Sequence, residues 1–260
     1  MRIRLSLVAV TYPAAMTTDH HHLASFIYEM IAVADPGLAD WLHNQGVATP
    51  GREDKRYKPL VFGLPESPRF RWDGFDKVFD RGIVYWQIAS PLEQVTTALL
   101  AGLALRKTFR IGRSDFMLAE AELLPAPMIQ PEMRFIALSP LTASVNAPGK
   151  DSAHNSKVYL RDETELGEAI KANLRWKYHV LTGQEANEAP LEFSFDQEFL
   201  RQRGGLLSRD VSRLVRYGQT QVKAFAAPFI VSGEPELIAV GWECGFGEAN
   251  AQGFGLAGLG

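Results

Sequence analysis

The chain has 260 residues, 46% of them hydrophobic and 22% charged, which is typical of a globular protein with one large domain or two small ones. Its single cysteine, Cys244, excludes an internal disulfide and a cysteine-based metal site, and its apolar runs are too short to cross a membrane. The formal net charge of −3 disfavours a general polyanion binder, although basic residues cluster at 106–113 and 201–223. We therefore expect a cytoplasmic protein without membrane association.

The N-terminal part of the chain predicts one strand and two helices. Residues 2–10 alternate between apolar and polar side chains, as a strand does. The next segment carries one apolar helical stripe, which consists of Leu23, Phe26, Ile27, Met30, Ile31 and Ala34. Thr18 or Asp19 can cap this helix, and Asp35 can cap a second, shorter helix that carries His43.

The remaining elements predict two similar halves. In the first half we expect strands at 56–64, 69–79, 82–90 and 115–124 and a helix from residue 91 that ends near Gly102. After a proline-rich joint at 125–131, we expect strands at 132–145, 191–199, 219–233 and 253–259 and helices at 162–183 and 235–244. Both halves follow the βαββαβ order of a ferredoxin-like unit. The predicted fold class is α+β, with tandem ferredoxin-like domains at residues 1–128 and 129–260.

A short amphipathic helix is predicted within residues 208–218. Arg209, Arg213 and Arg216 are spaced i, i+4 and i+7, so they share one face of such a helix opposite an apolar face. This arginine face is either a solvated surface or a contact for the phosphates of a nucleic acid.

Two Gly-Phe-Gly triplets lie eleven residues from end to end near the C-terminus, at 245–247 and 253–255. Glycine is favoured where the backbone needs a positive φ or approaches another group closely, and a glycine-rich loop can offer its amides to a phosphate. A dinucleotide-binding loop is excluded because only five residues follow Gly255, and the Gly-Lys-Ser/Thr of a Walker loop is absent. A phosphate-binding loop and a plain turn before the last strand remain.

Three consecutive histidines, at 20–22, suggest a metal site at first sight. Adjacent residues on a helix point in different directions, and no cysteine or further histidine at ligand spacing completes such a site. We therefore expect no metal. His21 shares a helix side with Tyr28, away from the apolar stripe, so both can face a ligand.

The segment GFGEANAQGFG resembles the C-terminal glycine-rich motif of the CRISPR-associated repeat-RNA endoribonucleases of the repeat-associated mysterious protein (RAMP) superfamily. LASFIYEMI and ADPGLADWLH are similar to the first helix and the short second helix of this family. KRYKPLVFG is similar to the following strand, and IALSPLTASV to the strand that opens the second domain. The resemblance covers nearly the whole chain in the same order.

The resemblance implies a metal-independent endoribonuclease without a cofactor that cleaves CRISPR repeat RNA, or pre-crRNA, into crRNAs. In this reaction the 2′-hydroxyl attacks its own phosphate and leaves a 2′,3′-cyclic phosphate and a 5′-hydroxyl. The family's catalytic histidine and tyrosine fall on His43 and Tyr28. Its lysine falls best on Lys55 by spacing, with Arg56 and Lys58 as close rivals.

The implied partners are CRISPR repeat RNA and crRNA, with a CRISPR effector complex and a homodimer as further options. The residues expected to contact RNA are His21, Arg56, Lys58, Arg209, Arg213, Arg216, Gly245, Gly247, Gly253 and Gly255. Two other classes remain open. One is a non-cleaving RNA-binding RAMP subunit of an effector complex, and the other is an mRNA-binding module of the RRM type, whose aromatic strand motif is not visible here.

Overall fold

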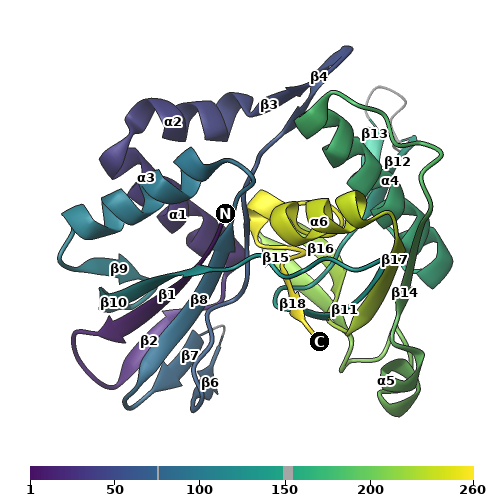
Figure 1. Cartoon of the computed structure of the whole chain (residues 1–260). Helices are drawn as coiled ribbons and strands as arrows, with labels where there is room; N and C mark the ends of the chain where they lie inside the picture. The colour runs from purple at the N-terminus through teal and green to yellow at the C-terminus, as the bar shows by residue number, and fades with distance from the viewer. Residues whose placement is uncertain (75, 149–154) are drawn as a thin grey trace. The chain divides into compact units, whose positions relative to one another are not determined.

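The computed structural model describes residues 1–74, 76–148 and 155–260 and divides the chain into two compact units (Figure 1). Unit 1 consists of Met1–Pro127 and Ala251–Gly253, and unit 2 consists of Met128–Asn250 and Phe254–Gly260. The division after Pro127 lies next to the predicted boundary at residue 128. The three C-terminal residues that belong to unit 1 were not predicted.

Unit 1 contains a five-stranded antiparallel sheet in the order β5-β8-β1-β10-β9. Its strands are β1 (Arg2–Ala9), β5 (Val61–Phe62), β8 (Ile83–Ala89), β9 (Phe109–Ile111) and β10 (Ser114–Leu124), and its long helices are α1 (His20–Ala34) and α3 (Glu93–Leu105). The order β5-β8-β1-β10 is that of a ferredoxin-like sheet. The core between sheet and helices includes Phe26, Phe62 and Trp86; the Trp86 ring lies 6.0 Å from that of Phe26 and 5.9 Å from that of Phe62.

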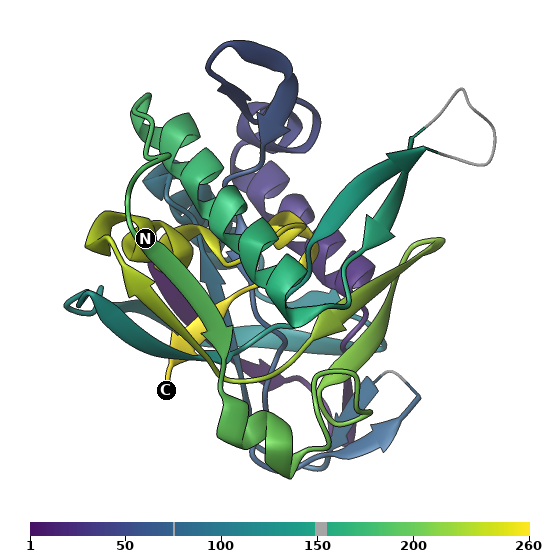
Figure 2. The same cartoon turned by 90° about the vertical axis from the view of Figure 1, so that its right-hand side faces the viewer.

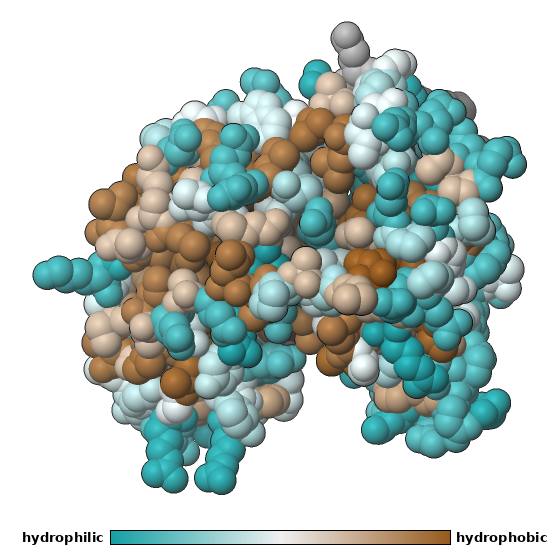
Figure 3. Space-filling view, viewed as in Figure 1, coloured by the Kyte–Doolittle hydropathy of each residue, from teal (hydrophilic) through white to brown (hydrophobic). Residues whose placement is uncertain are grey.

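Smaller elements extend unit 1. After α1 follow α2 (Pro36–Asp40) and a π-helix, η1 (Trp41–Gln45), and then the hairpin of β3 (Val47–Thr49) and β4 (Arg52–Tyr57). A separate three-stranded sheet consists of β2 (Ala14–Thr17), β7 (Asp76–Phe79) and β6 (Arg71–Asp73). In Figure 3, apolar surface gathers over α3, where Leu105 is 68% exposed.

Unit 2 repeats the same topology in the order β14-β17-β11-β18. Its elements are the strands β11 (Glu132–Ala137), β14 (Leu191–Phe195), β17 (Phe229–Gly233) and β18 (Ala257–Leu259) and the helices α4 (Glu163–Thr182), α5 (Gln197–Gln202) and α6 (Pro235–Cys244). Two hairpins are added, β12 (Ser144–Pro148) with β13 (Asn155–Tyr159) and β15 (Ser212–Tyr217) with β16 (Thr220–Phe225). Figure 2 shows both hairpins extending away from the sheet of unit 2. A 3-10 turn, η2 (Asn250–Gln252), lies where the chain passes from unit 2 to unit 1.

The structure confirms the tandem ferredoxin-like fold and most of the predicted elements. The side chain of Asp19 caps α1, and that of Asp35 caps α2 with Pro36 at its first turn. Helix α3 was predicted to end near Gly102, but it continues to Leu105. A Cβ at Gly102 would lie 1.8 Å from the carbonyl oxygen of Met30, so this glycine is there because α1 and α3 approach closely.

Several predictions of local structure were wrong. The strands predicted at 132–145 and 219–233 are each divided into two, β11 with β12 and β16 with β17, and the strand predicted at 191–199 ends at Phe195, before α5. Residues 69–79 form the two strands β6 and β7 instead of one strand, and the strand at 56–64 is divided into the end of β4 and the short β5. The last strand begins at Ala257 instead of residue 253. The amphipathic helix at 208–218 does not form, since residues 212–217 are a strand paired with β16. Within the described parts of the chain, no helix is both long enough and apolar enough for a membrane span.

Candidate active site

The side chains of Tyr28 and His43 meet in unit 1. Their ring centroids are 5.4 Å apart and their planes cross at 83°, an edge-to-face contact. Tyr28 lies half-buried on α1, away from the apolar stripe, and His43 lies exposed on η1. The position of η1 is fixed by its neighbour Leu42, which is fully buried, so His43 points outward while the turn itself is anchored.

A chain of hydrogen bonds orients the His43 ring. Its Nδ1 lies 2.9 Å from Oδ1 of Asn44, and Nδ2 of Asn44 donates to Oδ1 of Asp40 at 2.7 Å. Because the Asn44 amide uses its nitrogen on Asp40, its oxygen is the acceptor for the imidazole. The proton of neutral His43 therefore belongs on Nδ1, which leaves Nε2 as the proton acceptor. Sequence reasoning missed Asp40 and Asn44, although their positions three residues before and one residue after His43 were visible.

Of the three candidate cations, the structure brings Lys58 to His43. The Lys58 ammonium donates to the main-chain carbonyl of His43, and partial burial lowers the pKa of Lys58. The pairing of Val47 with Tyr57 in the β3–β4 hairpin explains this placement, because it returns the chain from η1 to the residue just before Lys58.

Lys55 and Arg56 lie further along the same hairpin with exposed side chains. The carbonyl of Lys55 accepts a hydrogen bond from Oγ1 of Thr49 at 2.8 Å, and Arg56 pairs with Ala48 in the ladder. The assignment of Lys55 as the catalytic cation stays a prediction, and the contact with His43 favours Lys58.

His21 lies exposed in the first turn of α1, where its amide donates to the capping carboxylate of Asp19 at 2.9 Å. The neighbouring His20 is buried, and burial lowers its pKa. Among the described residues, no group of three or more histidine, cysteine, aspartate or glutamate side chains is arranged to hold a metal ion.

The first glycine triplet is held from inside unit 2. Lys177, on α4 and 1% exposed, donates from Nζ to the carbonyls of Gly245 at 2.7 Å and Gly247 at 2.9 Å. Burial lowers the pKa of Lys177 to about 7. Gly247 has a φ of +74°, and a Cβ there would lie 2.4 Å from the carbonyl oxygen of Thr142. Sequence reasoning missed Lys177, although its spacing places it on the same buried face of α4 as Leu166, Ile170 and Leu174.

The second triplet is packed as tightly, with one glycine in each unit. In unit 1, a Cβ at Gly253 would lie 2.6 Å from the Phe62 ring. In unit 2, a Cβ at Gly255 would lie 2.0 Å from the carbonyl oxygen of Phe246. Both glycines have positive φ, +88° and +79°.

These contacts correct the expected use of the glycine amides. The amide of Gly245 donates to Gly241 and that of Gly255 to Pro140, both at 2.9 Å, so these two N–H groups are directed at protein carbonyls instead of a phosphate. Within the triplets, Gly245, Gly247, Gly253 and Gly255 are all buried. Internal packing is therefore sufficient to explain the motif, and RNA contacts at these four glycines stay a prediction.

The basic residues at 209–216 lie on a hairpin instead of a helix face. Arg213 and Arg216 are three apart in β15, so they point to opposite sides, and Arg209 precedes the strand. The guanidinium of Arg213 folds back onto the carbonyl of Arg209. Leu214 and Arg216 are two apart in β15 and share the outer side of the hairpin, where Leu214 is 61% exposed. Lys223 of β16 lies directly opposite Leu214 in the ladder and so shares that side.

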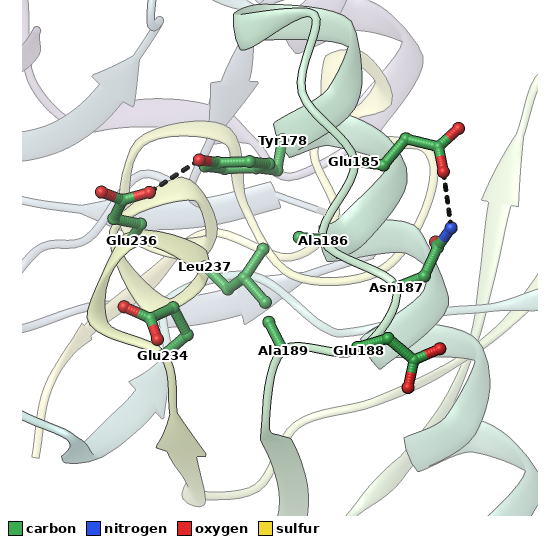
Figure 4. A pocket seen from close by; sticks show the side chains of 9 residues that line it. All are labelled: Tyr178, Glu185, Ala186, Asn187, Glu188, Ala189, Glu234, Glu236 and Leu237. Carbon is green, nitrogen blue, oxygen red and sulfur yellow. Dashed lines mark hydrogen bonds between the residues drawn. The ribbon is translucent and has the colours of Figure 1, made fainter.

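A pocket in unit 2 can be excluded as the place for an anionic ligand (Figure 4). Its lining contains no basic residue and four glutamates, Glu185, Glu188, Glu234 and Glu236. Tyr178 donates to Glu236 at 2.7 Å, and this hydrogen bond raises the pKa of Tyr178. Such a concentration of negative charge repels phosphate.

The fold and the candidate site together define a tandem ferredoxin-like protein in which a histidine just after the second helix contacts a tyrosine of the first helix and a lysine that follows β4. The family described as "CRISPR associated protein Cas6, C-terminal" matches residues 124–259, which is 136 of the 260 residues. The chain therefore belongs to the Cas6 family.

Similar proteins cover the whole chain. The "CRISPR-associated endoribonuclease Cas6 1" of Methanocaldococcus jannaschii is 26% identical, over 98% of this chain and 91% of its own length. The "CRISPR-associated endoribonuclease Cas6" of Pyrococcus furiosus is 27% identical, over 98% and 89%. A solved structure titled "CRISPR associated protein Cas6" aligns with a TM-score of 0.77 at 25% identity, over 100% of this chain and 99% of its own. The fold also matches "An RAMP protein binding different RNA substrates", with a TM-score of 0.79 at 17% identity over 100% and 99%.

Proposed function

We propose that the chain is an endoribonuclease that cleaves CRISPR repeat RNA into crRNAs without a metal. The observation that carries this proposal is the contact of His43 with both Tyr28 and Lys58 in unit 1. Membership of the Cas6 family, with relatives named endoribonucleases, supports the substrate class.

The reaction transfers a phosphoryl group within the RNA strand. His43 Nε2 accepts the proton of the 2′-hydroxyl while the 2′-oxygen attacks the adjacent phosphorus. The bond from phosphorus to the 5′-oxygen breaks, the 5′-oxygen takes up a proton, and the products are a 2′,3′-cyclic phosphate and a 5′-hydroxyl. The Asp40–Asn44 chain supports this assignment because it directs Nε2, rather than Nδ1, toward the substrate.

Lys58 and Tyr28 act on the phosphorane and on the leaving group. The lysine ammonium stabilises the extra negative charge of the transition state. Its lowered pKa also makes it a stronger proton donor toward the leaving 5′-oxygen than an ordinary lysine. The Tyr28 hydroxyl assists by hydrogen bonding to a phosphate oxygen.

The outer side of the β15–β16 hairpin binds the RNA backbone. Arg216 and Lys223 provide positive charge there, and Leu214 provides an apolar contact. The proposal includes two further partners besides the repeat RNA and its crRNA product. These are a CRISPR effector complex and a second copy of the chain in a homodimer.

The test is single-turnover cleavage of the repeat RNA from the host's own CRISPR locus. His43→Ala should lower the rate by roughly 10²–10⁴-fold with little change in RNA affinity, since a positioned acid or base contributes about that much. His22→Ala, an exposed histidine on α1, is the matched control. Cleavage should persist in excess EDTA and should stop when the nucleotide before the cut is 2′-deoxy.

Tight binding of the repeat RNA without cleavage by the unmodified chain would contradict the proposal. That result would support the alternative of a non-cleaving RAMP subunit. Restoration of activity by a divalent ion after chelation would contradict the metal-independent mechanism.

A further inference from the structure

The hairpin of β6 and β7 exposes two aromatic side chains next to each other. Phe70 is 41% and Trp72 is 59% exposed, and their ring centroids are 5.2 Å apart with the planes at 89°. They are two residues apart in an extended segment, so they share one side of the hairpin. A paired, exposed phenylalanine and tryptophan is an unusual surface for a globular protein and indicates a binding site.

A lysine completes this aromatic face, which we define as Phe70, Trp72 and Lys77. Trp72 and Lys77 are direct partners in the β6–β7 ladder. The ammonium of Lys77 lies 4.9 Å from the centroid of the Phe70 ring and 5.8 Å from that of Trp72, within the range of a cation–π interaction. It also donates to the carbonyl of Pro65 at 2.8 Å, so the cation is fixed beside the rings.

The hairpin that carries the aromatic face is held in place on two sides. β7 pairs with β2 along four residues, which fixes one edge. On the other side of the hairpin, Arg113 donates to Asp76 at 2.6 Å and to Asp73 at 2.7 Å. The same guanidinium offsets the charge of both aspartates, which weakens their repulsion of an anionic ligand at the aromatic face.

Two further arginines lie in the same segment. Arg69 and Arg71 alternate with Phe70 and Trp72 along the chain, so their side chains leave the opposite side of the segment, and both are exposed. Bases can stack on the exposed rings, Lys77 supplies a cation on the same face, and the two arginines add positive charge to the hairpin for the phosphates. This combination of aromatic rings and cations is that of a stacking platform for single-stranded nucleic acid. An apolar protein partner would not require these cations.

We propose that the aromatic face binds a single-stranded segment of RNA outside the cleavage site. The inference rests on the proposed function, since the RNA is the strand that flanks the repeat held for cleavage. In Figure 1, β6 and β7 lie at the opposite end of unit 1 from α2 and β3, which adjoin His43. The contact therefore adds affinity for longer transcripts and takes no part in the chemistry.

The experiment compares two RNAs on the full-length chain. One is the repeat alone, and the other is the repeat extended by about 15 unpaired nucleotides on either side, which is enough for one stacking site. Phe70→Ala with Trp72→Ala should weaken binding of the extended RNA about tenfold and leave the repeat alone unchanged. The single-turnover cleavage rate at saturating protein should not change. Trp72→Phe should keep most of the affinity because it keeps a ring.

Leu105→Ala, which removes an exposed apolar side chain from α3, is the matched control for loss of surface. A fluorescence readout supports the titration, since the chain has five tryptophans and the difference between wild type and Trp72→Phe isolates Trp72. Single-stranded RNA of unrelated sequence should quench that difference signal.

Equal affinity of the double variant and the wild type for the extended RNA, or no quenching of Trp72, would overturn the inference, and the aromatic face would then be a candidate for a protein partner instead. Neither result would affect the cleavage assay. Conversely, failure of the chain to cleave repeat RNA would contradict the proposed function, while the quenching measurement would still test the aromatic face.

Discussion

Two lysines, one in each unit, make the same hydrogen bond in different surroundings. Lys58 donates to the carbonyl of His43 and is partly buried, whereas Lys177 donates to the carbonyls of Gly245 and Gly247 and is almost fully buried. Burial lowers the pKa of both. The partly exposed lysine can still reach a substrate, and the enclosed one can only hold its own chain. The same residue type therefore suits chemistry in unit 1 and loop architecture in unit 2.

The largest expected effect tests the architectural side of this comparison. Gly247→Val should destabilise the protein by about 4 kcal/mol, because a left-handed residue costs roughly 1–2 kcal/mol and the side chain would also collide with the Thr142 carbonyl. Gly253→Val should behave similarly against Phe62. Urea denaturation measures both free energies of unfolding.

Gly218→Val is the control for these variants. Gly218 also has a positive φ, +59°, but a Cβ there would meet nothing within 4 Å, so only the backbone term applies. The free energy of unfolding of Gly247→Val could instead equal that of Gly218→Val while its affinity for RNA fell. The glycine motif would then be an RNA contact instead of a packed core.

The next effect concerns the pH dependence that Lys177 adds to stability. Its pKa is about 7 in the folded protein against 10.5 for the free side chain, so between these pH values the unfolded chain binds a proton that the folded chain does not. Stability should therefore rise with pH over this interval, by several kcal/mol. Neutral lysine has two N–H groups, which match the two carbonyls.

Lys177→Met should remove this part of the slope of stability against pH. The measurement is urea denaturation of the wild type and the variant in buffers from pH 7 to 10. Cys244 and Glu248, whose charges oppose the lowering of the pKa, should be retained in both proteins. A slope that is unchanged in the variant would show that Lys177 stays protonated.

Lys58→Ala should lower the single-turnover cleavage rate about 100-fold, since a cation on the transition state is worth a few kcal/mol. The melting temperature should remain close to that of the wild type because the Lys58 side chain is only partly buried. Lys55→Ala is the control at the position that spacing favours. A larger decrease for Lys55→Ala than for Lys58→Ala would return the catalytic cation to Lys55.

The smallest effect is expected on the β15–β16 hairpin. Arg216→Gln with Lys223→Gln should weaken repeat-RNA binding severalfold and reduce the slope of log K against log salt by about 0.7 for each phosphate that the protein no longer neutralises. Arg201→Gln, on α5, is the matched control. An unchanged slope would mean that the hairpin faces solvent in the complex.

Local signals predicted much of the fold. The caps at Asp19 and Asp35 and the apolar stripe of α1 specify both helices, and they place Tyr28 and His43. The cation was harder to assign because its reach depends on the register of Val47 with Tyr57, which no local pattern encodes.

The hairpin at 212–225 was missed because a helical spacing of three arginines coincided with a strand. Leu214 and Arg216 are two apart and share a side, which fits a strand as well as the arginine spacing fits a helix. Gly218, the first residue of the two-residue turn, was the signal that favoured a hairpin. Lys177 was missed because a lysine is ordinarily solvated, although its spacing from Ile170 and Leu174 places it on the apolar face of α4.

The short segment Ala251–Gly253, which belongs to unit 1 although it comes late in the sequence, has a consequence for biosynthesis. The carbonyl of Gln252 lies 3.0 Å from Nδ1 of His20, and Gly253 lies against Phe62. A ribosome must therefore synthesise 253 of the 260 residues before unit 1 has all of its parts. During translation, unit 1 therefore cannot complete its fold until this segment has been synthesised. A chain that is released early lacks part of the unit that carries His43.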